Sequence, residues 1–234
     1  MKIGIFGIDG VSQGRANIID SRVKALKAMF NSPKEVYIQA DVVTDAEKLV
    51  EADGIVAPET AKLDLIVNDM EFVETRLGRT TDEIEKNLFV RFKELLDKEK
   101  FLSEASLNDE EKKLIAGYSL LTIKPVYLAK PEETEDKEKL LFNAYYCFGY
   151  ISFFTAGEKD AHAWPVKKGA NAWEASGAIH SDIQKGFIRA EVVSYKDLTA
   201  DGSLSKARSS NHIRLEMKEY IVQDGDYLVF RCNK

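Results

Sequence analysis

The sequence has few of the residues that build metal centres or disulfide frameworks. Its 234 residues include two cysteines, Cys147 and Cys232, which lack the paired spacing of a zinc site. Both cysteines have apolar neighbours, so we expect their thiols to pack in a core. The three histidines, His162, His180 and His212, also lack the spacing of metal ligands. We therefore expect no metal site.

Long hydrophobic runs and an excess of positive charge are also missing. The opening apolar run is too short for a signal peptide and no later stretch could span a bilayer, so we expect a cytoplasmic protein without membrane contacts. The formal net charge of -6 argues against a protein that coats nucleic acid through bulk positive charge, and we expect no DNA partner. With 44% hydrophobic and 31% charged residues, the composition is that of an ordinary globular protein of one or two domains.

The first half of the chain alternates strand-like and helix-like segments. Apolar, β-branched runs at residues 3–8, 36–43, 54–57 and 121–129 are typical of strands, and residues 21–30 have the apolar spacing of an amphipathic helix. Strands that are almost wholly apolar indicate a parallel sheet covered on both faces. This pattern predicts an α/β domain.

Between the last two of these strands, the apolar spacing becomes helical. Apolar residues recur every three or four positions over residues 66–77 and 84–95, which predicts a helical hairpin. A capping box that begins at Thr80 fits the start of the second helix, and another at Asn108 predicts a third, short helix. We therefore expect an inserted helical arm over residues 63–117.

A run of charged residues interrupts the chain after this α/β part. Residues 130–139 contain no apolar residue apart from Pro131, and we interpret them as a linker. Short strand-like runs and turns follow, with one short helix over residues 170–179. The expected domains are therefore an α/β domain over 1–139 and a small β-rich domain over 140–234.

Three strings in the second domain are long and specific. They are Phe154-Thr155-Ala156-Gly157, the segment from Ile179 to Val192, and the segment from Tyr220 to Asp226. These strings closely resemble the C-terminal domain of the YchF/Obg-like ATPases. The resemblance implies a β-grasp fold of the TGS type, a module that in translation-related proteins is linked to RNA and ribosome contacts.

The upstream resemblance to this family is weaker but follows the family's order. Residues 2–11 are similar to its first strand and phosphate loop, and residues 21–45 to the segment leading to its second nucleotide motif. Residues 63–101 are similar to its inserted helical arm, and residues 121–125 to the strand before its base-recognition motif. The implied fold class is α/β: a degenerate P-loop-like parallel sheet with an inserted helical hairpin, followed by a TGS-like β-grasp domain.

The family's nucleotide motifs are degenerate in this chain. A working P-loop reads G-x-x-x-x-G-K-[ST], but Ser12, Gln13 and Gly14 stand at its last three positions. Gln13 is neutral and cannot supply the charge on which phosphoryl transfer relies, and Asp9 adds a negative charge. The second motif keeps only Asp45. The vestigial nucleotide-binding positions are Gly7, Asp9, Gly10, Gln13, Gly14 and Asp45.

Three interpretations of the function follow. The first is a protein without catalytic residues or cofactor that contacts RNA, the ribosome or a translation factor through its TGS-like domain. The alternative is an ATP- or GTP-binding protein, or an ATPase or GTPase with Mg²⁺ and an aberrant P-loop, in which Gln13 or Arg15 serves. In the third, the TGS-like domain is a small-ligand or regulatory module.

A modest basic surface in the second domain supplies the candidate partner contacts. Its charged residues are interleaved with Trp164, Trp173 and Phe187, as in surfaces that face RNA. It is equally consistent with the sequence that Trp164 and Phe187 belong to the core. The candidate contact residues are Lys167, Lys168, His180, Lys185 and Arg189.

Overall fold

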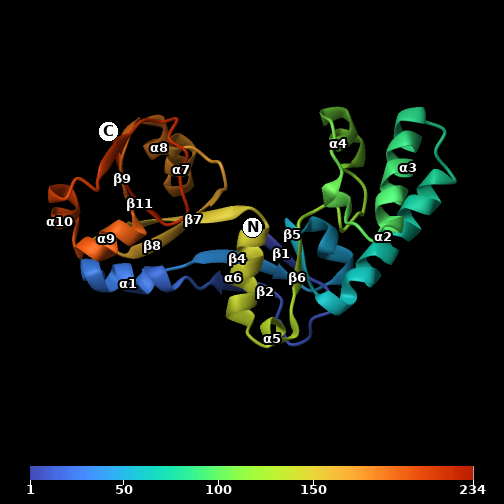
Figure 1. Cartoon of the computed structure of the whole chain (residues 1–234), viewed down its shortest axis with the longest axis horizontal. Coiled ribbons are helices and arrows are strands. Elements are labelled where there is room, and N and C mark those ends of the chain that lie inside the picture. Colours follow the sequence, from blue (N-terminus) through green and yellow to red (C-terminus); the bar gives the residue numbers. More distant parts are fainter. Residues whose placement is uncertain (234) are drawn as a thin grey trace. The chain divides into compact units, whose positions relative to one another are not determined.

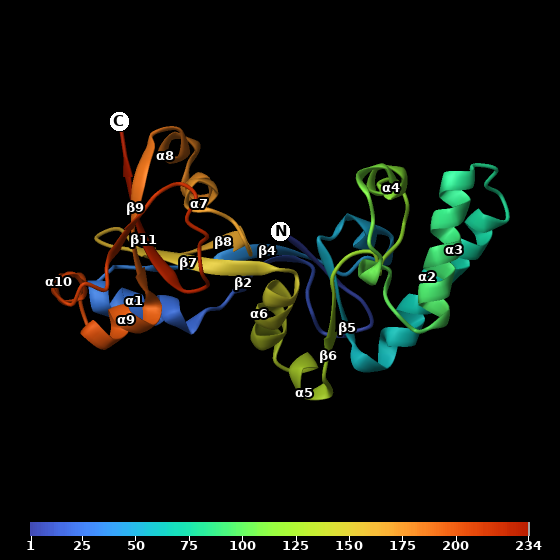
Figure 2. The same cartoon turned by 45° about the horizontal axis from the view of Figure 1, so that its top comes forward.

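The computed structural model describes residues 1–233, which fold into two compact units (Figure 1; Figure 2). Unit 1 comprises Met1–Ala16 and Ala40–Phe148. Unit 2 comprises Asn17–Gln39 together with the chain from Gly149 onward. The segment between Ala16 and Ala40 therefore leaves unit 1 and contributes to unit 2.

Unit 1 is built on a parallel sheet with the strand order β2-β4-β1-β5-β6. Strand β1 pairs in parallel with β4 and with β5, and β5 pairs in parallel with β6. Strands β1 and β5 are apolar and almost fully buried, which confirms the predicted parallel α/β sheet. The strands are β1 (Lys2–Ile5), β2 (Gly14–Ile18), β4 (Ile38–Val43), β5 (Gly54–Pro58) and β6 (Val126–Ala129).

The helical arm in unit 1 consists of α2 (Lys62–Leu77), α3 (Glu83–Asp97) and the short α4 (Asp109–Ile115). The predicted hairpin and the capping box at Asn108 are both confirmed. The cap expected at Thr80 is wrong, because Asp82 accepts the hydrogen bond from the Glu85 N–H at 2.9 Å. Three 3₁₀ turns complete the connections: η1 (Ala46–Glu51), η2 (Glu59–Ala61) and η3 (Leu102–Glu104).

A buried carboxylate anchors the arm to the segment that leads into β6. Asp69, on α2, is fully buried and accepts hydrogen bonds from the backbone N–H groups of Leu121 and Thr122 at 2.8 and 2.7 Å, and from the Thr122 hydroxyl. Burial raises the pKa of the Asp69 carboxyl, although these three donors oppose the shift. Because Leu121 and Thr122 bind Asp69, the strand expected from residue 121 begins only at Val126.

The charged run at residues 130–139 is helical and is not a linker. It forms α5 (Pro131–Thr134) and the start of α6 (Lys137–Cys147), whose N-cap Asp136 accepts the Lys139 N–H. Local caps thus start helices in a segment without apolar residues, and α6 then buries an apolar face from Leu140 to Tyr145. The change from unit 1 to unit 2 falls at Gly149, nine residues beyond the division expected at residue 140.

Unit 2 is built on a mixed sheet with the strand order β10-β9-β11-β7-β8-β3. Antiparallel pairs join β7 to β8, β9 to β11 and β10 to β9, while β11 pairs in parallel with β7 and β3 in parallel with β8. The strands are β3 (Glu35–Val36), β7 (Tyr150–Ala156), β8 (Ala161–Lys167), β9 (Phe187–Ser194), β10 (Arg214–Glu216) and β11 (Asp226–Cys232).

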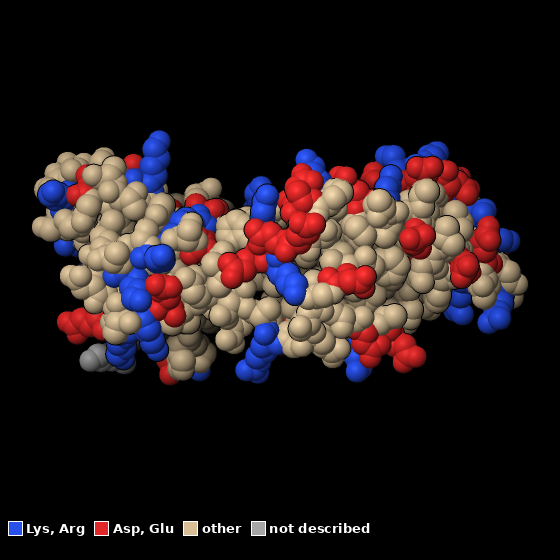
Figure 3. Space-filling view, turned by 90° about the horizontal axis from the view of Figure 1, so that it is seen from below, with Lys and Arg blue, Asp and Glu red and all other residues tan. Residues whose placement is uncertain are grey.

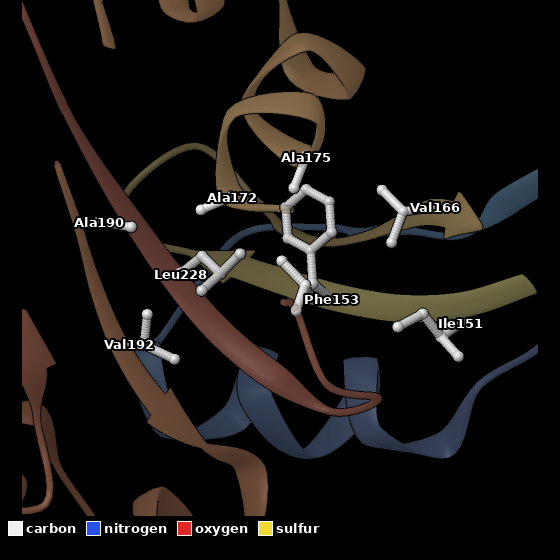
Figure 4. Close-up of a cluster of buried hydrophobic side chains, with 9 residues drawn as sticks. Ile151, Phe153, Val166, Ala172, Ala175, Ala190, Val192 and Leu228 are labelled. Atoms are coloured by element: carbon white, nitrogen blue, oxygen red, sulfur yellow. The ribbon is translucent and has the colours of Figure 1, made fainter. Parts of the chain in front are cut away.

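Helices cover both faces of this sheet. On one face Ala172 and Ala175 of α7 meet Phe153, Val192 and Leu228 in an apolar core (Figure 4). On the other face α1 packs on β7 and β8 and α9 packs on β9 and β11. The helices are α1 (Ser21–Phe30), α7 (Ala172–Ile179), α8 (Ser181–Lys185), α9 (Tyr195–Asp201) and α10 (Leu204–Ser209).

Helix α1 forms where predicted, but it covers the sheet of unit 2 instead of the parallel sheet. Its Arg22 binds Asp20 and Asp224, each at 2.7 Å, and the guanidinium lies 4.9 Å from the centre of the Phe154 ring. At the other end of α1 the Phe30 and Tyr227 rings stack at 5.2 Å. Residues 17–39 therefore supply a helix and an edge strand to the C-terminal sheet.

Both cysteines are exposed, which contradicts the expectation that they pack in a core. Cys147 is the last residue of α6, where its thiol lies 3.6 Å from the Val126 carbonyl oxygen. Cys232 follows a register shift between Arg231 and Cys232 and lies at the exposed end of β11. Within residues 1–233, no helix combines the length and the apolarity that a membrane span requires.

Replacing Arg22 by Met should destabilise unit 2 selectively. The Arg22 side chain is 19% exposed and that of Asp224 is 35% exposed. We therefore expect the free energy of unfolding to fall by about 2 kcal/mol, which is less than the roughly 3–5 kcal/mol lost when a fully buried pair is broken. Amide exchange should accelerate in α1, β7 and β8. The helices α2 and α3 serve as the internal control, and equal acceleration there would contradict a local role.

Glu85 should make the arm sensitive to acid. Burial alone raises its pKa, but hydrogen bonds from Thr80, Tyr118 and Arg76 outweigh burial and lower the pKa from 4.5 to about 2. A carboxylate whose pKa falls on folding stabilises the fold above pH 4.5, and this stabilisation disappears as the pH falls toward 2. We expect the melting temperature of Glu85→Gln to be lower than the parent's at pH 7, with the difference vanishing near pH 2. A constant difference across this window would refute the assignment.

Candidate functional site

A depression in unit 1 lies at the carboxyl ends of the parallel strands. It has a volume of about 620 Å³ and is open to solvent. After β1 the chain passes to β2, beyond β4 at one edge of the sheet, and after β5 it passes to β6 at the other edge. Such a reversal at the carboxyl ends of parallel strands is where open α/β sheets commonly bind ligands. The pocket is lined by Gly7, Ile8, Asp9, Pro58, Thr60, Thr134, Glu135 and Lys137.

The loop after β1 has the backbone turns of a glycine-rich loop. Gly7 and Gly10 have φ values of 65° and 72°, which side-chain-bearing residues rarely adopt. A Cβ on Gly7 would lie 3.7 Å from Ala61 and Pro58, so the backbone angle rather than lack of space favours glycine at this position.

The element that follows this loop is a strand and not a helix. The loop ends at Gly14, where β2 begins, so a strand that was not predicted lies between the strand expected at residues 3–8 and the helix expected at residues 21–30. P-loops bind phosphate through free N–H groups at a helix N-terminus. The next helix, α1, belongs to unit 2, and its N-cap Asp20 already accepts the Arg22 N–H. The loop therefore has no helix N-terminus to offer a phosphate.

The charges around the pocket are mixed. Asp9 and Glu135 contribute carboxylates, and Lys137 contributes the cation. The Lys137 ammonium lies 3.8 Å from the position that a Cβ on Gly10 would occupy. Sequence reasoning missed Lys137 because it lay in the run interpreted as a linker. The N-cap preference of Asp136 was the signal that could have placed a helix start there.

Only some of the predicted nucleotide-binding residues lie at this pocket. Gly7 and Asp9 line it, and Gly10 lies beside Lys137. Gln13 and Gly14 are exposed at the start of β2 and are not among the lining residues. Asp45 is also elsewhere: it caps η1 by accepting the Glu47 N–H and pairs with Lys48 at 3.3 Å. Within residues 1–233, no group of three or more His, Cys, Asp or Glu is placed to hold a metal ion.

The candidate partner residues of unit 2 occupy several places. Lys167 ends β8 and Lys168 follows it, and both border an open pocket of about 460 Å³. The Lys167 ammonium lies 3.6 Å from the centre of the Tyr150 ring. His180 caps α8, because its Nδ1 accepts the Asp182 N–H at 3.1 Å. His180 therefore has a structural role in starting that helix.

Lys185 and Arg189 do not complete one continuous patch with the β8 lysines. Lys185, at the end of α8, lies 3.9 Å from Asp182. Arg189 is on β9, three strand positions from β8 in the sheet order β9-β11-β7-β8, a separation of about 14 Å at 4.8 Å per strand. The set that the sequence grouped together is thus divided between distant parts of the sheet.

Of the three aromatic residues interleaved with these charges, one is at the surface. Trp164 and Phe187 are half-buried against the apolar core, and the Trp164 indole N–H donates to the Thr155 hydroxyl at 3.0 Å. Trp173, on α7, is 44% exposed. The core interpretation therefore holds for Trp164 and Phe187.

Comparison with known proteins gives consistent matches. Residues 150–233 match the family model of the YchF GTPase C-terminal domain, described as "Protein of unknown function (DUF933)". The ribosome-binding ATPase YchF of Bacillus subtilis is 33% identical over 240 aligned positions, covering 75% of this chain and 66% of that protein. Obg-like ATPase 1 of Caenorhabditis elegans is 26% identical, covering 94% of this chain and 72% of that protein. The chain thus spans about two thirds of the length of the Bacillus relative.

A solved structure has the same fold. The YchF GTPase of Schizosaccharomyces pombe superposes with a TM-score of 0.75 and 17% sequence identity, covering 99% of this chain and 97% of that chain. At this identity the likeness concerns the fold alone. Since the C-terminal family model, the sequence relatives and the fold all agree, the chain belongs to the YchF/Obg-like ATPase family.

Proposed function

We propose that this protein binds the ribosome through unit 2 and does so without a nucleotide. Relatives in Bacillus subtilis and Haemophilus ducreyi are named ribosome-binding ATPases, which supports the ribosome as the partner. The ribosome-binding ATPase of Mycoplasma genitalium reaches 48% identity over a stretch of 90 residues. The family model of the C-terminal domain matches residues 150–233, which lie in unit 2, so we assign the surviving role to this unit.

We infer nucleotide independence mainly from the strand that follows the loop after β1. Phosphate binding by a P-loop needs a helix N-terminus and a lysine, and the chain has β2 at the one place and Gln13 at the other. Asp9 adds a carboxylate where phosphate would lie. On these grounds we assign no ATPase or GTPase activity to the chain.

One observation favours the alternative, a nucleotide-binding role. The pocket beside this loop is large enough for a small ligand, lies where α/β sheets bind ligands, and contains the cation of Lys137 opposite Gly10. A lysine from α6 would then replace the missing P-loop lysine. The two roles differ in whether a nucleotide changes ribosome binding.

The nucleotide-free protein should co-sediment with purified bacterial ribosomes. We expect the bound fraction to stay the same when ATP or GTP is added with Mg²⁺, because the loop lacks the groups that would sense a γ-phosphate. Phosphate release should stay at the background rate. A bound fraction that changes several-fold with ATP, or turnover that requires Mg²⁺, would favour the alternative.

Lys137→Ala provides the direct test of the pocket. If the pocket holds no nucleotide, isothermal titration with ATP or GTP should give no heat of binding for either the parent or the variant. Lys139→Ala is the matched control, since Lys139 is an exposed lysine on the same helix that does not line the pocket. Binding by the parent and by Lys139→Ala that is lost in Lys137→Ala would establish the nucleotide-binding role instead.

A further inference from the structure

Two arginines face each other across neighbouring strands of unit 2. In the antiparallel register of β9 and β11, Arg189 is directly opposite Arg231. Side chains of directly opposite residues lie on the same face of a sheet with their Cβ atoms about 5 Å apart, and like charges in this arrangement destabilise the pair. The sheet thus contains a local repulsion that its sequence does not avoid.

These arginines occupy the uncovered end of one sheet face. On this face Val193 and Tyr227 are buried, and Tyr227 stacks on Phe30 of α1. Farther along the same two strands, Arg189 is exposed and the Arg231 side chain is 56% exposed. The helices α1 and α9 therefore cover one end of the face and leave the arginine end open to solvent.

The charge at this open end is not balanced. Glu191 is the carboxylate between the arginines: it accepts from Arg231 at 2.5 Å and from Arg208, on α10, at 2.9 Å. Among residues 1–233, no hydrogen bond or ion pair joins Arg189 to another side chain. We call Arg189, Arg208 and Arg231 the arginine cluster. With Glu191 it carries a net charge of about +2, since guanidinium groups are always protonated.

An apolar side chain shares this face with the arginine cluster. In the space-filling view of Figure 3, blue Lys and Arg side chains are interspersed with red Asp and Glu side chains over the visible face. Leu215, which is paired with Glu191 across β10 and β9 and so shares this face, is 61% exposed. The surface is therefore an open strand face with cations and an apolar side chain, and not an enclosed pocket.

We propose that the arginine cluster binds the phosphodiester backbone of single-stranded RNA. This proposal rests on ribosome binding by unit 2 and names the contact surface and its chemistry. Guanidinium groups form bidentate hydrogen bonds with phosphate, and an anion between Arg189 and Arg231 would remove their repulsion. Glu191 offsets only part of this positive charge, and proteins commonly break a local rule of this kind at functional sites. The open face suits an extended strand, because a chain of phosphates can contact successive cations.

The decisive variant is Arg189→Glu. A glutamate opposite Arg231 replaces a repulsive pair by an attractive one, so the melting temperature should stay the same or rise. Binding to a fluorescein-labelled 12-nucleotide oligo(U) should weaken at least fivefold at 100 mM salt in fluorescence anisotropy. A residue with only a structural role would not give higher stability together with weaker RNA binding.

The neutral variant Arg189→Gln tests the number of phosphate contacts. The RNA association constant K falls as the salt concentration rises, and losing one contact should make the slope of log K against log salt less steep by about 0.7. Between 50 and 200 mM salt, the fall in affinity should therefore be about 2.6-fold smaller for the variant than for the parent. Lys34→Glu is the matched control for Arg189→Glu, since it makes the same charge change at an exposed lysine next to β3, four strand positions from β9 in the sheet. We expect it to weaken RNA binding less than twofold.

Several outcomes would overturn the arginine cluster as the RNA site. They are an unchanged affinity in Arg189→Glu, an equal loss in Lys34→Glu, no RNA binding by the parent, and binding to phosphatidylserine vesicles in place of RNA. Ribosome sedimentation keeps this failure separate from that of the proposed function. If the parent and Arg189→Glu sediment equally with ribosomes, the cluster is excluded and ribosome binding stands; if the parent does not sediment, ribosome binding itself fails.

Discussion

The docking of α1 on the six-stranded sheet is the constraint on which much of this structure depends. The Arg22 guanidinium pairs with Asp20 and Asp224 and lies over Phe154, while Phe30 covers Tyr227. Without this helix the aromatic side chains on that face would meet water, at a cost of roughly 1.5–3 kcal/mol for each large apolar side chain. Its position is set by ionic contacts at one end and by ring stacking at the other.

The same docking explains the state of the loop after β1. A chain can use a given segment only once, and residues 21–30 are used as the cover of unit 2. They cannot also form the helix that a phosphate loop needs at its end. The loop therefore leads into a strand, β2, and Gln13 and Asp45 do not lie with Gly7 and Asp9 at the pocket. Under the proposed function, the use of α1 in unit 2 is the reason why this loop does not bind phosphate.

The helices α1 and α9 cover only part of one face of the six-stranded sheet, and the part left open contains two like charges. Because α1 and α9 reach only part of one face, the ends of β9 and β11 stay open, and Arg189 and Arg231 lie there side by side. A protein optimised for stability alone would place opposite charges across these strands. The sheet keeps two like charges at the place where it can meet a partner.

Much of the local structure could be predicted because it depends on neighbouring residues. Apolar spacing indicated α2 and α3, and the Asn108 capping box indicated α4. Local signals were also present where the prediction was wrong: Pro131 and the cap at Asp136 begin helices inside a charged run that we had interpreted as a linker. Of the pocket residues, the sequence indicated Gly7 and Asp9, since they lie in a recognisable loop, but not Lys137, which α6 brings in from far along the chain.

The sequence by itself indicated the types of many elements, the family and the neutral Gln13 in the loop after β1, since each of these depends on a short stretch of residues. Only the tertiary structure decided which sheet α1 covers and which residues share a face. Arg22 and Asp224 are 202 positions apart, and Arg189 meets Arg231 through a strand register. Such pairings depend on the relative free energies of alternative packings of the whole chain, to which local periodicity contributes no information.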